Sequence, residues 1–79
     1  MSPEQAFSRV IRRLRLEAKL TQEQLAFESN LDRTYISLLE RGLRQPTLTS
    51  MVQLSAALRI APSTLMTYIE EAMNATDAE

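Results

Sequence analysis

Apolar residues recur along this chain at intervals of three and four, the spacing that lines one face of an α-helix. In the first such run the apolar positions are Phe7, Val10, Ile11 and Leu14, with charged residues between them. Similar runs follow, separated by short polar stretches rich in residues typical of helix starts and stops. The pattern predicts an all-helical chain without β-strands, with helices near residues 3–19, 22–29, 33–41, 48–58 and 62–73.

Short local signals mark where several of these helices begin. Ser2 and Thr21 are each followed three residues later by Gln, a pair that caps a helix start reciprocally. Thr47 and Asp32 are placed to cap two further helices. The carboxylate of Asp32 also suits the positive end of the helix dipole, so we expect a strong cap there.

The segment Thr21–Gly42 is the most informative part of the chain. It predicts two short helices joined by a tight turn, because Asn30 tolerates the left-handed backbone that such a turn requires. Gly42 is placed to end the second helix, and the small Ala26 lets the two helices cross closely. The second helix then begins with Arg33 on a polar outer face. This layout is typical of a helix-turn-helix, whose second helix enters the DNA major groove; an ordinary helical hairpin is the alternative.

Composition and length exclude several classes of protein. The 79 residues suit one domain, which we place at residues 1–74, followed by a disordered acidic tail at 75–79. The chain has no cysteine and no histidine, so we expect no disulfide, no metal site and no cofactor. The usual catalytic bases and nucleophiles and a glycine-rich phosphate loop are also missing, so we do not expect an enzyme.

Hydropathy indicates where the protein works. No apolar run approaches the ~20 residues that a membrane-spanning helix needs, and no signal peptide is visible. We therefore expect a cytoplasmic protein with no membrane contact.

Charge is distributed unevenly along the chain, whose net charge is −1. Residues 1–60 hold all nine basic residues and six of the ten acidic ones, whereas residues 61–79 hold four acidic residues and no basic one. DNA affinity depends on local phosphate contacts rather than on the overall sum of charges. The acidic C-terminal segment is therefore compatible with DNA binding if it faces away from the DNA.

Five helices in this order, with the motif as the second and third, resemble the phage-repressor and Cro-type (XRE) helix-turn-helix family over residues 5–70. The residues that carry the resemblance are Arg13–Arg15, Thr21–Ala26, Ile36-Ser37, Leu39–Gly42, Pro46–Leu48 and Ala57-Leu58. The resemblance implies a compact five-helix, lambda-repressor-like DNA-binding fold.

Within that family, the stretch AFESNLDRTYIS at residues 26–37 is most similar to the controller proteins of restriction–modification systems. These are small dimeric regulators that time the expression of an endonuclease. The stretch LLERG at residues 38–42 is common among generic regulators of the family, so a generic repressor is an alternative. A second alternative is an antitoxin-like protein-binding module, which the acidic C-terminus would suit.

The resemblance also implies a role for each residue that matches the family motif. Phosphate contact is implied for Gln22, base reading for Arg33, Thr34 and Ser37, a sugar or phosphate contact for Tyr35, apolar contact for Leu38, and backbone or groove-edge contacts for Arg44 and Gln45. Arg suits guanine O6 and N7, and Thr suits a thymine methyl. Arg15 and Glu40 match a shielded ion pair that ties the first helix to the third.

The last predicted helix carries an apolar stripe formed by Leu65, Met66, Ile69 and Met73, with Tyr68 beside it. Part of such a stripe must pack on the domain itself, and the family resemblance implies that it also forms a two-fold dimer interface. One short helix reads too few base pairs for a unique site, so a homodimer on a near-palindromic operator is expected. The expected partners are double-stranded DNA, a second copy and, for a regulator of transcription, RNA polymerase.

Overall fold

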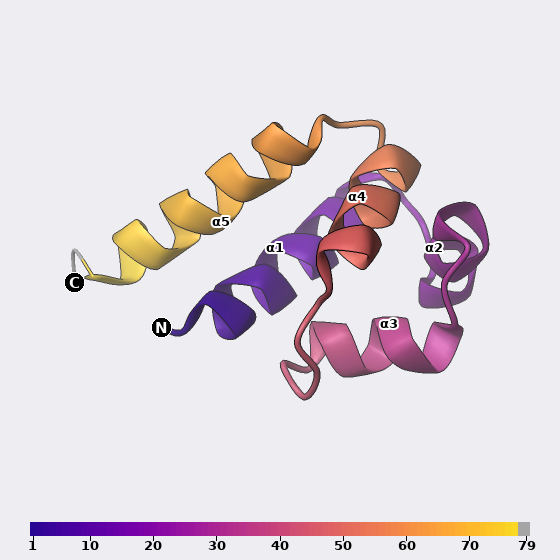
Figure 1. The fold of residues 1–79 in the computed structure, drawn as a ribbon, viewed down its shortest axis with the longest axis horizontal. Helices are drawn as coiled ribbons and strands as arrows, with labels where there is room; N and C mark the ends of the chain where they lie inside the picture. Colours follow the sequence, from indigo (N-terminus) through magenta and orange to yellow (C-terminus); the bar gives the residue numbers. More distant parts are fainter. Residues whose placement is uncertain (78–79) are drawn as a thin grey trace.

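A computed structural model describes the backbone of residues 1–77 and the side chains of residues 1–75. The described residues form helices only: α1 (Pro3–Glu17), α2 (Gln22–Ser29), α3 (Arg33–Glu40), α4 (Leu48–Ala57) and α5 (Pro62–Asp77) (Figure 1). The predicted all-α fold with five helices is confirmed. No helix in the described part of the chain is long and apolar enough to cross a membrane.

Reciprocal capping fixes the start of three helices. The hydroxyls of Ser2, Thr21 and Thr47 each accept a hydrogen bond from the backbone three residues on, and the side chain at that third position accepts one from the cap backbone. Asp32 differs from the prediction, since its backbone is extended as a cap requires but its carboxylate makes no capping hydrogen bond. Its contribution is then limited to its charge at the positive end of α3.

The first four helices end in the same way. Lys19, Asn30, Gly42 and Arg59 follow the helices with φ between 58° and 72°, the left-handed region. The next residue in each case donates its N–H back to a carbonyl of the last turn, as Leu31 does to Ala26 at 2.9 Å. Asn30 and Gly42 were expected to do this, whereas Lys19 and Arg59 were not. These stops make the turn between α2 and α3 short and rigid.

The core gathers residues from all five helices. Its buried apolar members are Ala6, Phe7, Val10, Ile11, Leu25, Ala26, Ile36, Leu39, Leu54, Leu65 and Ile69. α1 packs against α5 along one side and against α3 along another, while α2 packs on both α3 and α4 (Figure 1). Burial of each large apolar side chain stabilises the fold by about 1.5–3 kcal/mol. The core therefore holds α2 and α3 as one unit with their outer faces free.

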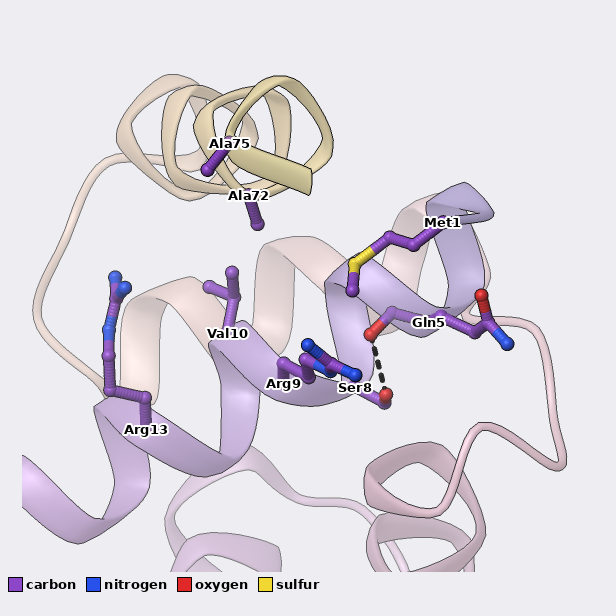
Figure 2. A pocket seen from close by; sticks show the side chains of 8 residues that line it. All are labelled: Met1, Gln5, Ser8, Arg9, Val10, Arg13, Ala72 and Ala75. Atoms are coloured by element: carbon purple, nitrogen blue, oxygen red, sulfur yellow. Dashed lines mark hydrogen bonds between the residues drawn. The ribbon is translucent and has the colours of Figure 1, made fainter. Parts of the chain in front are cut away.

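α5 is the helix whose extent differs most from the prediction. It continues to Asp77, although its end was expected near residue 73 and a disordered tail at 75–79. Ala72 and Ala75 of α5 lie beside α1, opposite Val10 (Figure 2). Ala72 is half-buried and Ala75 is exposed, because a groove lies between this part of α5 and α1. The last two residues of the predicted tail, 78–79, lie outside the described residues.

Candidate nucleic-acid interface

The outer face of α3 presents a contiguous set of polar side chains. Arg33 and Thr34 are exposed at its first turn, and Ser37 and Leu38 follow half-buried one turn later. Ile36 and Leu39, on the opposite face, are each 1% exposed. Residues at spacings of three and four are neighbours on a helix face, so Ser37 lies beside Arg33 and Thr34, and Leu38 beside Thr34, which brings these four candidate readers together. Arg41 continues this face as the C-cap of α3, donating from Nε to the Ser37 carbonyl oxygen at 3.4 Å.

Tyr35 occupies the edge of α3 that faces α4, not its outer face. Its hydroxyl lies 3.1 Å from the hydroxyl of Ser50. The Ser50 hydroxyl donates its only proton to the Thr47 carbonyl oxygen at 2.9 Å, which leaves Tyr35 as the donor in this pair. The bond anchors α3 to the start of α4. The role in sugar or phosphate contact that was expected for Tyr35 stays a prediction, and the tyrosine would have to leave Ser50 to donate to a phosphate.

The loop after α3 places a cation beside this tyrosine. The Arg44 guanidinium lies over the Tyr35 ring, 5.6 Å from its centre, a cation–π contact that limits where the guanidinium can move. Arg44 is exposed at the C-terminal end of α3, where a groove edge would lie in a helix-turn-helix complex. Gln45 lies elsewhere, bordering a small apolar hollow with Met51 and Met66.

A surface hollow of about 510 Å³ opens at the N-terminus of α2. It is bordered by Arg15, Leu16, Lys19, Leu20, Thr21, Gln22, Glu23 and Arg33. The unpaired N–H groups of a helix start favour an anion, and Lys19 and Arg33 add two side-chain cations. The sequence analysis did not name Lys19 as a candidate site residue. Its position two residues before the Thr21 cap was the available signal.

Arg15 and Glu40 join α1 to α3 through a two-pronged ion pair. Arg15 Nε donates to Glu40 Oε2 at 2.6 Å and Nη2 donates to Oε1 at 2.9 Å. The side chains are only 10% and 3% exposed. The hydrogen bond to Glu40 raises the pKa of Arg15, although burial acts in the opposite direction, so the guanidinium is charged at every usable pH.

The same ion pair is connected to the end of the α1–α2 loop where α2 begins. Arg15 Nη1 donates to the Leu20 carbonyl oxygen at 2.9 Å, immediately before the Thr21 cap. Gln22, the first residue of α2, donates from Nε2 to Glu40 Oε1 at 3.2 Å. Gln22, which was expected to contact a phosphate, is therefore hydrogen-bonded to the predicted ion pair.

The residues of the apolar stripe of α5 lie in different surroundings, some in the core and some at the surface. Leu65 is 0% and Ile69 3% exposed, both inside the core, so their predicted exposure at a dimer interface is wrong. Periodicity identified the apolar face, but α1 and α4 already cover its centre. Met66 remains 48% exposed and Met73 is half-buried near the same edge. Tyr68 lies on the other edge, half-buried beneath Arg13, whose guanidinium is 5.2 Å from the ring centre.

A second groove, of about 690 Å³, runs between α1 and the C-terminal half of α5 (Figure 2). Arg9 and Arg13 line it together with Gln5 and Ser8, whose hydroxyl donates to the Gln5 carbonyl oxygen at 2.7 Å. None of its lining residues comes from α2, α3 or the loop after α3. These two arginines are thus exposed on a part of α1 that is separate from the surface around Arg33.

Comparison with known proteins places this geometry in a family. A family model described as helix-turn-helix matches residues 11–65. Control protein C.BamHI of Bacillus amyloliquefaciens is 41% identical over 63 residues, 78% of each chain. The crystal structure of the restriction–modification controller protein C.AhdI from Aeromonas hydrophila superposes with a TM-score of 0.76 at 42% identity, covering 78% of this chain and 94% of that one.

A further match is a crystal structure of the controller protein C.Esp1396I as a tetramer in complex with its natural 35-base-pair operator. Its TM-score is 0.84 at 36% identity, and the match covers 91% of this chain and 95% of that one. That structure shows the fold bound to operator DNA in a protein more than one third identical to this chain.

Proposed function

The chain belongs to the helix-turn-helix family, of the phage-repressor and Cro type that its motifs indicated, and from this premise we propose its function. It is a sequence-specific, double-stranded-DNA-binding regulator of transcription that acts as a homodimer on a near-palindromic operator. We further propose that it is the controller protein of a restriction–modification system. The observation that carries the proposal is the exposed face of α3, with Arg33 and Thr34 at its first turn, on a fold like that of the controllers.

α3 enters the major groove and reads base edges with its first turns. Arg33 suits a guanine through O6 and N7, and Thr34 suits a thymine methyl or an acceptor. Ser37 adds one short hydrogen-bonding group, whereas Leu38 offers only apolar contact. This helix therefore offers few hydrogen-bonding groups to the bases, and most of the discrimination between base pairs rests on Arg33.

Phosphate contacts on both sides of α3 fix its position on the duplex. Gln22 and the N-terminus of α2 take one backbone phosphate, with Lys19 bordering the same hollow. Arg44 takes the backbone or the groove edge at the other end of α3. These contacts carry no sequence information, but they set the register in which Arg33 meets the bases.

We place the dimer interface on the side of the domain where α4 and α5 meet. Met66 borders an apolar hollow of about 190 Å³ with Pro46, Met51 and Ile69. Leu48 and Val52 of α4 are 80% and 45% exposed, so apolar surface continues beyond α5. Exposed apolar surface of this kind marks interfaces, and a two-fold axis buries the same patch on both copies.

The dimer sets two recognition helices about 34 Å apart, one turn of B-DNA, which is why the operator is a near-palindrome. The acidic residues Glu70 and Glu71 lie exposed on α5, a helix that supplies none of the proposed DNA contacts. The regulator acts in the cytoplasm without a cofactor or an enzymatic activity of its own. RNA polymerase is its partner wherever it activates transcription.

The experiment that tests DNA recognition is selection of bound duplexes from a random pool, followed by affinity measurements at several salt concentrations. A near-palindromic consensus bound much more tightly than random duplex is expected, with affinity falling steeply as salt rises. Binding that shows neither a consensus nor a salt slope would leave the protein-binding module as the remaining interpretation. A consensus next to the genes of a restriction–modification system supports the controller role.

The dimer is tested by sedimentation at micromolar concentration with Met66→Asp. Thr67→Asp is the matched control, because Thr67 is exposed on the same helix but does not line the apolar hollow that Met66 borders. Ile69→Asp would not serve, since it places a charge in the core and unfolds the domain. Met66→Asp should be monomeric and bind the operator weakly. A wild-type protein that sediments as a monomer would rule out the interface.

A further inference from the structure

The carboxylate of Glu40 is the meeting point of three helices. Its two oxygens accept from Arg15 Nε and Nη2, and Oε1 also accepts from Gln22 Nε2. The carboxylate side chain is 3% exposed, whereas Gln22 is half-buried and borders the hollow at the start of α2. The amide nitrogen of Gln22 therefore contacts a buried carboxylate, while the exposed part of the same side chain borders the hollow where a phosphate would lie.

We propose that Glu40, held by Arg15, is a positioning residue for DNA binding: it orients the amide of Gln22 so that its second N–H points at a backbone phosphate. The inference rests on the proposed function and deepens it. The ion pair between α1 and α3 is then part of the DNA-binding device as well as part of the scaffold.

The chemistry of the amide explains why an acceptor is needed behind it. A glutamine amide carries two N–H donors and one oxygen, and its terminal torsion is broad and roughly two-fold. A carboxylate accepts hydrogen bonds but donates none, so it favours the NH₂ group and repels the amide oxygen. Glu40 thus selects one of the two amide orientations, the one that leaves a donor for the phosphate. Preorganisation of this kind raises affinity because less freedom is lost on binding.

Arg15 makes a carboxylate acceptable at this position. An unpaired carboxylate beside a DNA phosphate would repel it, but the Arg15 guanidinium neutralises Glu40 with two hydrogen bonds. Through Nη1 the same guanidinium also holds the Leu20 carbonyl oxygen, which fixes the chain just before α2 begins. The start of α2 is therefore held at a constant distance from α3, and the phosphate contact at a constant distance from Arg33.

A double-mutant cycle on the full chain tests the coupling between Gln22 and Glu40. Gln22→Met keeps the length of the side chain without its donors, and Glu40→Gln keeps the shape of the carboxylate without its charge. We expect Gln22→Met to weaken binding to operator and random duplex alike, by roughly five- to tenfold, with the salt slope nearly unchanged because a neutral amide releases no counterion.

The decisive comparison is the effect of Glu40→Gln in the two backgrounds. It should weaken DNA binding severalfold in the wild-type background and leave the affinity of the Gln22→Met variant unchanged. Equal losses in both backgrounds would overturn the inference, because a purely structural role acts whether or not Gln22 has its amide. Gln53→Met is the matched control, since it removes a glutamine from α4, a helix that supplies none of the proposed DNA contacts.

A spectroscopic measurement on the unmodified protein covers the case in which Glu40→Gln is too unstable to compare. In proton–nitrogen spectra one of the two Gln22 side-chain N–H protons should be displaced from the position usual for a solvent-exposed glutamine amide, because Glu40 holds it already in the free protein. Titration with operator DNA should shift the other proton strongly and the held one little. Equal shifts of both would count against the proposal, whereas absence of DNA binding by the wild type would instead reject the proposed function.

Discussion

The segment Thr21–Gly42 and helix α5 both carry apolar residues at helical spacing, yet they leave different chemistry at the surface. In Thr21–Gly42 the core takes Leu25, Ile36 and Leu39 while Phe27 of α2 stays 85% exposed. Arg33 and Thr34 lead an outer face of α3 that is mostly polar. In α5 the core takes Leu65 but leaves Met66 nearly half exposed. A polar face on a rigid helix suits DNA, whereas an apolar residue left over at the edge of a packed helix suits a second protein surface.

The largest effect should come from breaking the ion pair that supports Thr21–Gly42. Glu40→Ala strands the buried Arg15 charge and should lower the free energy of unfolding by about 3–5 kcal/mol, as measured by urea denaturation. Glu23→Ala, at an exposed position of α2, is the control and should change it by less than ~0.5 kcal/mol. Similar midpoints for the two variants would mean that the pair is not effectively buried.

The next-largest effect should distinguish a core residue of α5 from a surface residue of the same helix. Leu65→Ala removes a side chain that is 0% exposed and should cost about 2–5 kcal/mol at any protein concentration. Met66→Ala should cost far less in dilute solution but should raise the dissociation constant of the dimer. Denaturation at several concentrations separates the two, and a concentration-independent midpoint in the wild type would contradict the interface at Met66.

The two kinds of DNA contact proposed for Thr21–Gly42 should respond differently to truncation. Arg33→Ala should cost about 1–3 kcal/mol at the operator and relax base preference at one position of each half-site. Gln22→Ala should instead weaken all duplexes about equally, since phosphate contacts carry no sequence information. Arg9→Ala, which lies in the α1–α5 groove, is the matched control and should leave affinity nearly unchanged. A uniform loss from both Arg33→Ala and Gln22→Ala would show that the reader was misassigned.

The smallest effect should arise at the C-terminal stop of α3. Gly42 has a φ of +72°, and a Cβ added there would meet only the Ser8 hydroxyl at 3.8 Å, an ordinary contact. Gly42→Ala should therefore destabilise the domain through backbone conformation alone, by about 1 kcal/mol in thermal or urea unfolding. Asn30→Gly, at a φ of +58°, should be close to neutral or slightly stabilising. A larger loss from Gly42→Ala would point to a steric clash instead.

Much of the fold followed from signals that act over three or four residues. The cap hydroxyl of Thr21, the turn residue Asn30 and the terminal Gly42 each do what their chemistry favours locally. The outward position of Arg33 and Thr34 followed from the inward position of Ile36 and Leu39, because one helix face fixes the other. Such local inference has limits, since Lys19 and Arg59 adopt the left-handed conformation although neither residue type favours it. Nothing in the structure explains why the Asp32 carboxylate makes no capping hydrogen bond.

The sequence by itself determined the helices, their order, the outward face of α3 and the family. Only the tertiary structure decided which helix covers which face. It buried Leu65 and Ile69 under α1 and α4, turned Tyr35 toward Ser50, and joined Gln22 to Glu40. The physical reason is the range of the forces: a cap or a turn is settled between near neighbours in the chain. A hydrogen bond from Gln22 to Glu40 joins residues 18 positions apart, and it exists only once the core has set α2 against α3.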